Sequence, residues 1–295
     1  MAYELPDLSA PLELPFDSII DVRSPDEFAE DHLPGAISLP VLDNDERAIV
    51  GTIYKQESPF KARKVGAALV AQNAARHLQG PLADKDGGWQ PLVYCWRGGQ
   101  RSNSLASIFR QVGWRADVLT GGYQTYRRAV VAQLYDCELP HRFVLIDGDT
   151  GTAKTEILHL VATRGGQVLD LEGLANHRGS VLGPRPDGQP SQKMLETRLV
   201  AALARLDPAR PVLVEAESSK VGDLLVPPAV WQAMRAAPRI RMQASVEDRA
   251  KYLARAYADI SADREGLKDI LSLLVRLQGH ERVKGWKRMV DDGQF

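Results

Sequence analysis

The stretch LVYCWRGGQRSNS, residues 92–104, decides the fold of the first part of the chain. It begins with a short apolar run typical of a buried strand, and two glycines then lead into a predicted helix with Ser102 as its cap. Cys95 therefore lies in a tight loop between a strand and a helix. The helix N-terminus and the guanidinium groups of Arg97 and Arg101 favour a thiolate over a thiol at Cys95. The sequence predicts a nucleophilic cysteine beside an anion-binding loop, against the alternative of an inert buried thiol.

Further short strands lie on either side of this loop in the sequence. Residues 19–23 form an apolar run, and Ser24 and Pro25 then start a predicted helix. Residues 32–40 predict a turn and a strand, and residues 117–123 predict a strand that ends at two glycines. Strands that alternate with helices predict a parallel sheet, with the site at the carboxyl ends of its strands.

These pieces resemble the rhodanese family over roughly residues 15–130, and they predict a rhodanese-like domain at residues 1–135. The resemblance implies that Cys95 carries sulfur or selenium. Five residues separate Cys95 from Arg101, one more than is typical of single-domain rhodaneses, which favours a larger tetrahedral donor such as selenophosphate. An insertion at about 43–90 is too long for a simple connection. Its basic residues predict either contacts with RNA phosphates or an ordinary solvated face, and they are Lys61, Arg63, Lys64 and Arg76.

A second motif follows the apolar run at residues 141–146. The sequence GDTGTAKT at 148–155 then leads into a predicted helix, which is the strand-to-helix setting of a P-loop. Ala153 stands where the pattern expects its last glycine, so a degenerate scaffold loop is the alternative to phosphate binding. The predicted phosphate-binding residues are Gly148, Thr150, Gly151, Thr152, Ala153, Lys154 and Thr155.

Polar side chains follow two more predicted strands of this second domain, which is expected at residues 136–295. Glu215 and Glu217 end one strand, where P-loop proteins hold a metal or water partner. Both are predicted to help orient a substrate, with an ordinary solvated strand end as the alternative. Glu172, His177 and Arg178 follow another and are predicted to orient a substrate. A role for His177 as general base competes with a local hydrogen bond. The segments from Val246 onward predict amphipathic helices that either contact tRNA or keep the surface soluble. The basic residues expected on their exposed faces are Arg249, Lys251, Arg255, Lys284, Lys287 and Arg288.

Composition places few limits on function. The chain has 295 residues, room for two domains, and a net charge of −1, which gives no overall attraction to nucleic acid. It has two cysteines, no predicted signal peptide and no apolar run of membrane-spanning length, so we expect a cytoplasmic protein without a membrane partner. Cys137 has no glycine or arginine neighbours and is interpreted as a bystander, with a resolving role as the alternative. The sequence assigns no resident metal site and no tightly bound cofactor, and it leaves the metal requirement open, with the Thr155 hydroxyl as the candidate metal contact of the P-loop.

The order of the two domains, together with residues 171–179 and 215–218, resembles the tRNA 2-selenouridine synthase family over nearly the whole chain. The resemblance implies an α/β protein: a rhodanese-like parallel sheet domain, then a P-loop NTPase-like α/β domain with C-terminal helices. It implies that selenium replaces the sulfur of wobble 2-thiouridine in tRNAs for lysine, glutamate and glutamine. The implied substrates are selenophosphate, from a selenophosphate supply, and geranyl diphosphate, with Mg²⁺ as a possible companion. Family members usually continue further beyond Trp286, so we expect this chain to lack part of the tRNA contact.

Two other functions remain open on the sequence. One is a rhodanese-type sulfurtransferase fused to a nucleotide-dependent kinase, in which the P-loop binds ATP. The other is a non-catalytic RNA-binding scaffold, which Ala153 and the short C-terminus favour.

Overall fold

The computed structural model describes residues 1–179, 183, 185 and 187–293, and the chain divides into two compact units. The first unit comprises residues 1–139 and 190–205, and the second comprises residues 140–189 and 206–295. The sequence predicted one boundary near residue 135 with everything after it in the second domain. The segment 190–205 instead belongs to the first unit.

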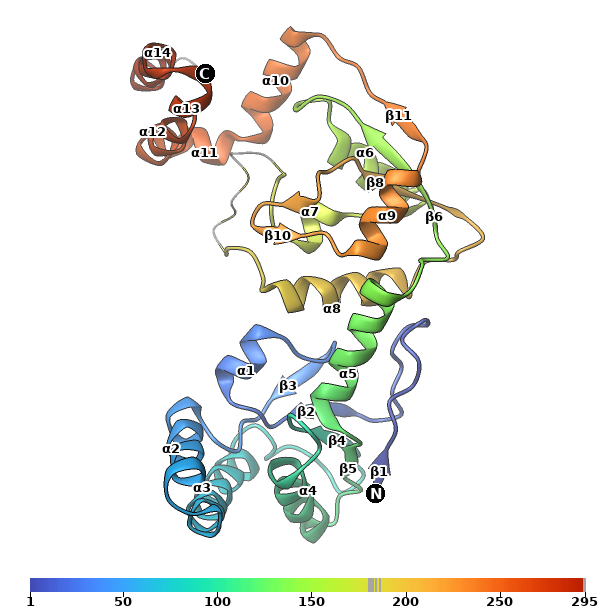
Figure 1. The fold of residues 1–295 in the computed structure, drawn as a ribbon, viewed down its shortest axis with the longest axis vertical. Helices are drawn as coiled ribbons and strands as arrows, with labels where there is room; N and C mark the ends of the chain where they lie inside the picture. The colour runs from blue at the N-terminus through green and yellow to red at the C-terminus, as the bar shows by residue number, and fades with distance from the viewer. Residues whose placement is uncertain (180–182, 184, 186, 294–295) are drawn as a thin grey trace. The chain divides into compact units, whose positions relative to one another are not determined.

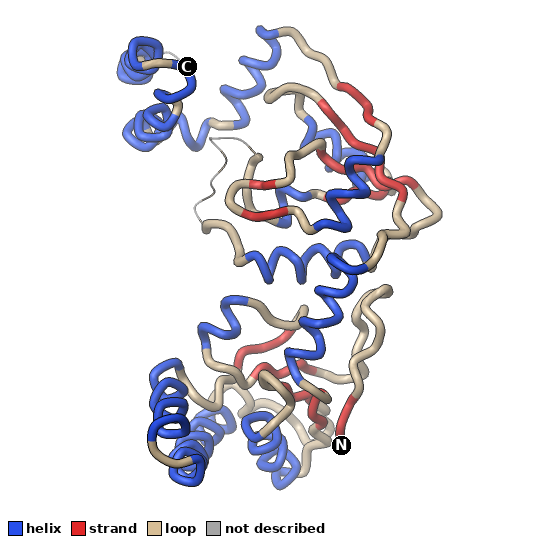
Figure 2. Tube along the Cα trace, in the orientation of Figure 1, coloured by secondary structure: helices blue, strands red, loops and turns tan. Residues whose placement is uncertain are grey.

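The first unit is built on a five-stranded parallel sheet in the order β1-β5-β4-β2-β3 (Figures 1 and 2). Its strands are β1 Ala2–Tyr3, β2 Ser18–Asp21, β3 Ala36–Ser38, β4 Pro91–Tyr94 and β5 Asp117–Leu119. The middle strand β4 is buried at all four residues, as its apolar run predicted. The predicted parallel α/β sheet is confirmed, and it places the start of the Cys95 loop at a carboxyl end near its centre.

The helices of the first unit include two from the insertion. They are α1 Pro25–Glu30, α2 Asn44–Gln56, α3 Pro59–Gln79, α4 Gln100–Val112, α5 Gly122–Val131, the π-helix η1 Ala132–Asp136 and α8 Gln192–Leu203. The side chains of Asp43 and Ser58 cap α2 and α3 at their N-termini. These two helices lie side by side in Figure 1, and α3 also contacts α4. The insertion therefore adds a helical pair beside the helix that follows the Cys95 loop.

Helix α8 is fixed within the first unit by a buried carboxylate. Glu196 is 1% exposed and accepts hydrogen bonds from the guanidinium of Arg127 on α5 and from the hydroxyl of Tyr135, the latter at 2.7 Å. A buried carboxylate is costly unless it is paired. The pairing explains why α8 packs against α5 and η1.

A buried ion pair anchors the end of strand β2. Arg23 is 1% exposed and Asp21 is fully buried, with 2.6 Å between Nη2 and Oδ2. Nη2 also donates to the carbonyl of Asp31 at 2.6 Å, and the guanidinium lies 3.9 Å from the centre of the Tyr123 ring. These contacts join β2, the turn before β3 and the start of α5.

We expect Arg23→Met to destabilise the protein by about 3–5 kcal/mol, because it leaves the Asp21 carboxylate buried without its partner. The matched control is Arg47→Met, which removes an ion pair to Glu27 from a side chain that is 51% exposed. That change should cost less than about 1 kcal/mol. Urea unfolding followed by circular dichroism measures both, and equal costs would show that the buried pair is not the anchor.

The second unit has a four-stranded parallel sheet in the order β11-β6-β8-β7. Its strands are β6 Arg142–Asp147, β7 Gln167–Leu169, β8 Pro211–Glu215 and β11 Arg239–Arg241, with a separate antiparallel pair of β9 Lys220–Val221 and β10 Leu224–Leu225. Its helices are α6 Lys154–Thr163, α7 Leu171–Leu174, α9 Pro228–Ala236, α10 Val246–Ala256, α11 Ala258–Ala262, α12 Arg264–Leu273, α13 Val275–Gln278 and α14 His280–Asp291. Ile146 of β6 is in register with Glu215 of β8, so the loop after β6 begins beside the Glu215 carboxylate. The predicted P-loop fold with C-terminal helices is confirmed.

Across the described part of the chain, no helix combines the length and the apolar character needed to cross a bilayer.

Candidate functional site

The Cys95 loop occupies residues 95–99 between β4 and α4. Two glycines with left-handed backbones allow its compact course. A Cβ on Gly98 would lie 2.7 Å from the carbonyl oxygen of Leu119, and a Cβ on Gly122 would lie 2.2 Å from that of Cys95. Gly98 and Gly122 therefore allow the cysteine loop and the turn after β5 to contact each other directly. Only residues without a side chain permit such a close approach.

Cys95 is 3% exposed, and its sulfur lies among hydrogen-bond donors. The Gly99 N–H donates to Sγ at 3.2 Å, and the Ser102 hydroxyl lies 3.2 Å from it. Burial raises the pKa of the thiol, but hydrogen bonds from the Ser102 side chain and from the Ser102 and Arg97 amides outweigh it, with help from the charge of Arg101. The net effect is a lowered pKa for Cys95. The loop therefore stabilises a thiolate.

The prediction that Ser102 caps the helix is wrong. Gly99 is the N-cap of α4, and Ser102 is the third residue of its first turn. Its hydroxyl instead contacts the Cys95 sulfur and the Gly99 carbonyl. Helix α4 has no side-chain cap, and the N–H of its N-cap residue Gly99 donates to the Cys95 sulfur. Ser102 is therefore a direct contact of the sulfur.

Arg97 in the loop and Arg101 in the first turn of α4 have different surroundings. Arg101 forms an ion pair with Glu27 at 2.8 Å, and Arg47 contacts the same carboxylate at 3.0 Å. Burial opposes ionisation of Glu27, but the Arg101 partner prevails and lowers the pKa of Glu27 to about 2. Arg97 is exposed, and it is its backbone amide that acts on the sulfur. Arg101 is thus held in place by Glu27, while the Arg97 guanidinium is presented to solvent.

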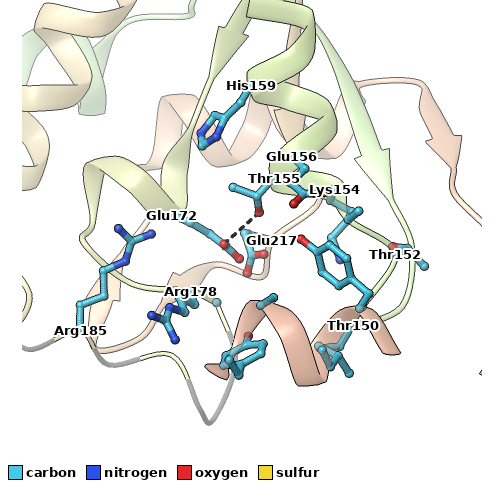
Figure 3. A pocket seen from close by; sticks show the side chains of 17 residues that line it. Thr150, Thr152, Lys154, Thr155, Glu156, His159, Glu172, Arg178, Arg185 and Glu217 are labelled. Atoms are coloured by element: carbon cyan, nitrogen blue, oxygen red, sulfur yellow. Dashed lines mark hydrogen bonds between the residues drawn. The ribbon is translucent and has the colours of Figure 1, made fainter. Parts of the chain in front are cut away.

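The P-loop lies in the second unit between β6 and α6, and Figure 3 shows the pocket that it helps to form. The Lys154 ammonium donates to the carbonyl of Gly148 at 2.7 Å, which folds the side chain back over the loop. Thr152 donates to the carbonyl of Asp149 at 2.8 Å. A pocket of about 300 Å³ opens beside this loop. Its size suits a small phosphorylated ligand.

Ala153 adopts the left-handed conformation that the expected glycine would adopt, with φ of 59° and ψ of 31°. This conformation costs a residue with a side chain about 1–2 kcal/mol. The alanine therefore does not prevent the left-handed turn that leads into α6. This geometry favours a phosphate-binding loop over the alternative of a degenerate scaffold loop.

Three carboxylates and a hydroxyl gather beside the lysine. The Thr155 hydroxyl donates to Glu215 at 2.5 Å and lies 3.4 Å from Glu172, the contact drawn as a dashed line in Figure 3. Burial and the charge of Glu217 raise the pKa of Glu172 to about 7. Burial and the charge of Glu172 raise the pKa of Glu215 to about 7, and that of Glu217 is also raised, chiefly by burial. Glu172 and Glu215 therefore exchange protons with solvent near neutral pH.

We expect Glu215→Gln to stabilise the ligand-free protein at pH 8 by roughly 1–3 kcal/mol, since one unit of pKa shift corresponds to about 1.4 kcal/mol. The folded pKa lies above the ordinary 4.5, so the stability that Glu215 contributes is present below pH 4.5 and is lost as pH rises through about 7. Thermal unfolding from pH 5 to 8 measures the difference, which should grow with pH.

The matched control is Glu156→Gln, because Glu156 also lines the pocket but is exposed on α6. It should change stability little at any pH. A Glu215→Gln variant that is less stable than the wild type at pH 8 would contradict the raised pKa.

The remaining predicted residues separate into two groups. Glu172, Arg178 and Glu217 line the P-loop pocket together with Thr150, Gly151, Thr152, Ala153, Lys154 and Thr155. Gly148, His177 and Glu215 do not. His177 is 7% exposed, accepts at Nδ1 from the Gly179 N–H at 3.0 Å, and has a pKa lowered mainly by burial. This environment favours the local hydrogen-bonding role over the general base.

Helix α10 forms a wall of the pocket that the sequence did not predict. Tyr252, Leu253 and Ala256 line it, followed by Tyr257, whose ring lies 5.2 Å from the Arg178 guanidinium. Arg249 donates to the carbonyl of Thr150 at 2.9 Å and pairs with Asp149 at 3.0 Å. Arg249 was expected on an exposed face of an amphipathic helix, but it ties α10 to the P-loop. Arg185 also lines the pocket and was not predicted.

Among the residues the structure describes, no group of three or more histidine, cysteine, aspartate or glutamate residues has metal-binding geometry. One carboxylate oxygen nevertheless lacks a partner: Glu215 Oε2 is buried without a hydrogen bond. Together with the Thr155 hydroxyl, it offers two oxygen atoms to a hard cation that arrives with a phosphorylated ligand.

Comparison with known protein families finds two domains, in the order that the sequence predicts. The rhodanese-like domain family matches residues 4–129, and the tRNA 2-selenouridine synthase AAA domain family matches residues 141–269.

Three relatives carry the name tRNA 2-selenouridine synthase. The protein of Nitrosomonas europaea is 36% identical over 74% of this chain and 57% of its own length. That of Alcanivorax borkumensis is 35% identical over 81% of this chain and 66% of its own. That of Chromohalobacter salexigens is 34% identical over 86% of this chain and 69% of its own. The chain thus spans less than two thirds of the first two relatives.

Proposed function

This chain belongs to the tRNA 2-selenouridine synthase family, and on that premise we propose that it replaces the sulfur of wobble 2-thiouridine in tRNA by selenium through an S-geranyl intermediate. The sulfur of a thiocarbonyl is a poor leaving group. Alkylation converts it into a thioether that departs as a thiolate. Such a reaction needs a site for an alkyl donor and a site for the selenium donor.

The P-loop pocket is proposed to bind geranyl diphosphate. The observation that carries this assignment is the combination of Lys154 and the loop amides with an apolar wall at Leu253 and Ala256. The lysine and the amides suit a diphosphate, and the wall suits a prenyl chain. In the transfer step the sulfur of 2-thiouridine forms a bond to the first carbon of the geranyl group, and the carbon–oxygen bond breaks. Its electron pair leaves with the diphosphate, whose charge Lys154 stabilises.

A Mg²⁺ ion is proposed to accompany the diphosphate, with the Thr155 hydroxyl and the Glu215 carboxylate as its protein ligands. The ion would neutralise charge on the leaving diphosphate. Its binding would also favour the ionised form of Glu215, whose pKa is raised in its absence.

Cys95 is proposed to perform the selenium step. Its lowered pKa supplies a thiolate, and the surrounding amides and Arg101 suit an anionic donor such as selenophosphate. We propose that the Cys95 sulfur forms a bond to the phosphorus of selenophosphate. The phosphorus–selenium bond breaks, and its electron pair leaves with selenide, which is held at the site for attack on the base. Water then breaks the sulfur–phosphorus bond and releases phosphate, which restores the thiolate. Arg97, which is exposed at the rim of the loop, is proposed to contact the incoming donor.

The proposed partner is tRNA for lysine, glutamate and glutamine. We also propose that the enzyme acts in the cytoplasm and depends there on a supply of selenophosphate. The basic residues of α3 are available on the surface of the first unit. Lys61 pairs with Glu57, and the side chains of Lys61, Arg63 and Lys64 remain exposed. These are the residues we propose for backbone contacts.

A second candidate is ATP binding at the P-loop, in a sulfurtransferase fused to a kinase. Tyr252 and Tyr257 favour it, because aromatic rings beside a P-loop can stack on a base. This function predicts ATP hydrolysis or phosphoryl transfer without geranyl diphosphate.

Mass analysis of nucleosides tests the proposal. We expect tRNA that carries 2-thiouridine to gain a geranyl group with geranyl diphosphate alone, and to contain 2-selenouridine when selenophosphate is also present. No change of the nucleoside in any mixture would overturn the proposed function. ATP turnover in its place would support the second candidate.

A further inference from the structure

A groove of about 650 Å³ opens in the first unit between the helices of the insertion and α4. Its apolar lining comes from Leu42, Val50, Tyr54, Val70 and Ile108. The Tyr54 side chain is 59% exposed although it lines the groove, so the fold leaves apolar surface uncovered here. Neither of the steps described above uses this surface.

One end of the groove adjoins the Cys95 loop. Gln100 lines the groove and directly follows Gly99, whose N–H contacts the Cys95 sulfur at 3.2 Å. Arg101 also lines it. Since consecutive Cα atoms are about 3.8 Å apart, the groove begins about one residue from the contacts of the sulfur.

The groove then runs along α4 away from the loop. Gln100, Ser104, Ser107 and Ile108 all line it, and this spacing marks one face of a helix over two turns. Charge is concentrated in the groove at Arg101 and at Arg63 on α3, while Val50, Val70 and Ile108 are apolar. An anionic or polar group at Cys95 with an apolar chain attached to it matches this arrangement.

We infer that this groove binds the geranyl chain of the S-geranyl-2-thiouridine intermediate while its base is presented to Cys95, an inference that rests on the proposed function. In the selenium step, a selenium nucleophile held at Cys95 forms a bond to C2 of the base. The bond between C2 and sulfur breaks, and its electron pair leaves with geranylthiolate, which takes a proton from solvent. The geranyl chain is therefore attached to the reacting centre throughout this step and must lie near Cys95.

On this inference, the helices of the insertion take part in the reaction by binding the geranyl chain. The groove volume of about 650 Å³ lies within the range of about 300–1,000 Å³ typical of ligand pockets. Burial of the chain would bind the alkylated tRNA in preference to the unmodified one, since each buried methylene contributes to affinity. The groove thus selects the intermediate over its precursor.

Ala67→Trp and Ser104→Trp test the inference, because both residues line the groove and are exposed enough to accept a larger side chain. The matched control is Ala68→Trp, the next residue of α3, which is exposed but does not line the groove. Anticodon stem-loops with S-geranyl- or S-methyl-2-thiouridine are the substrates. We expect the wild type and Ala68→Trp to form 2-selenouridine at least about tenfold faster from the geranyl substrate, as burial of several carbons implies. The two groove variants should lose this preference while their Cys95 alkylation rate is unchanged.

Calorimetric binding of the S-geranyl-2-thiouridine nucleoside to the full chain separates the inference from the proposed function. The wild type and Ala68→Trp should bind it at least about tenfold more tightly than the groove variants. Binding with this pattern but without any turnover would overturn the proposed function and leave the groove assignment standing. A geranyl preference retained by the groove variants, or no binding to the wild type, would overturn the inference. Dissociation of a dimer on substitution of Ala67 would also overturn it, because a second copy would then be the occupant.

Discussion

We expect Cys95→Ala to abolish the formation of 2-selenouridine, with a loss of at least about a thousandfold, and to leave geranyl transfer unchanged. The substitution removes the thiolate that the Gly99 amide and the Ser102 hydroxyl stabilise. Loss of a covalent nucleophile has effects of this size or larger. The P-loop lies in the other unit of the chain, so its chemistry should continue. Nucleoside mass analysis with both donors measures the two products in one sample, and geranylated tRNA should accumulate.

Cys137→Ala is the matched control, because Cys137 is the exposed free thiol of the chain. It should retain both products if Cys137 is the bystander that the sequence predicts. Full selenium transfer by Cys95→Ala would show that the donor reacts directly with the tRNA. Loss of selenium transfer in Cys137→Ala would make that residue the resolving thiol.

We expect Lys154→Ala to show the opposite pattern. Geranyl transfer from geranyl diphosphate should fall by about 10²–10³-fold, because the leaving diphosphate loses a positioned charge in the P-loop. The Cys95 loop should remain intact, so selenium transfer to tRNA that is already geranylated should persist. Nucleoside analysis with 2-thiouridine tRNA and with S-geranyl-2-thiouridine tRNA as separate substrates measures the two steps.

The control for this variant is Lys220→Ala, which removes an exposed lysine of strand β9. It should leave both steps unchanged. If Lys154→Ala kept full geranyl transfer, the P-loop would not be the diphosphate site. If it lost both steps on the separate substrates, the two reactions would not be divided between the P-loop and Cys95.

Local patterns predicted most of the fold and the family. The strand, loop and helix around Cys95 are adjacent in the sequence, so periodicity and glycine placement were sufficient to predict them. The same holds for β6, the P-loop and α6. The parallel sheets follow from the alternation of strands and helices, and the resemblance to the tRNA 2-selenouridine synthase family is confirmed by the comparisons. The chemical roles of Cys95, Lys154 and the other proposed site residues remain predictions.

Contacts between distant parts of the chain were not predictable in the same way. The amphipathic pattern of α10 indicates that one face is buried, but it does not say that Arg249 and Leu253 pack on the P-loop. The position of Ser102 suggested a cap because serine commonly fills that role, whereas the sulfur beside it decides the actual contact. The raised pKa of Glu172 depends on burial and on the charge of Glu217, and that of Glu215 depends on burial and on the charge of Glu172. Neither the burial nor these neighbours can be seen in a linear sequence.

The position of α8 has a consequence for how the protein folds during its synthesis. Glu196, the buried partner of Arg127, is synthesised after the P-loop and after strand β7, although it completes the first unit. Domains generally fold as the nascent chain emerges, with the N-terminal one first. Here the first unit lacks a helix until residues beyond 205 have left the ribosome. The second unit is then still unfinished because β8 and β11 follow. Neither unit can therefore reach its final structure until more than two thirds of the chain has been synthesised.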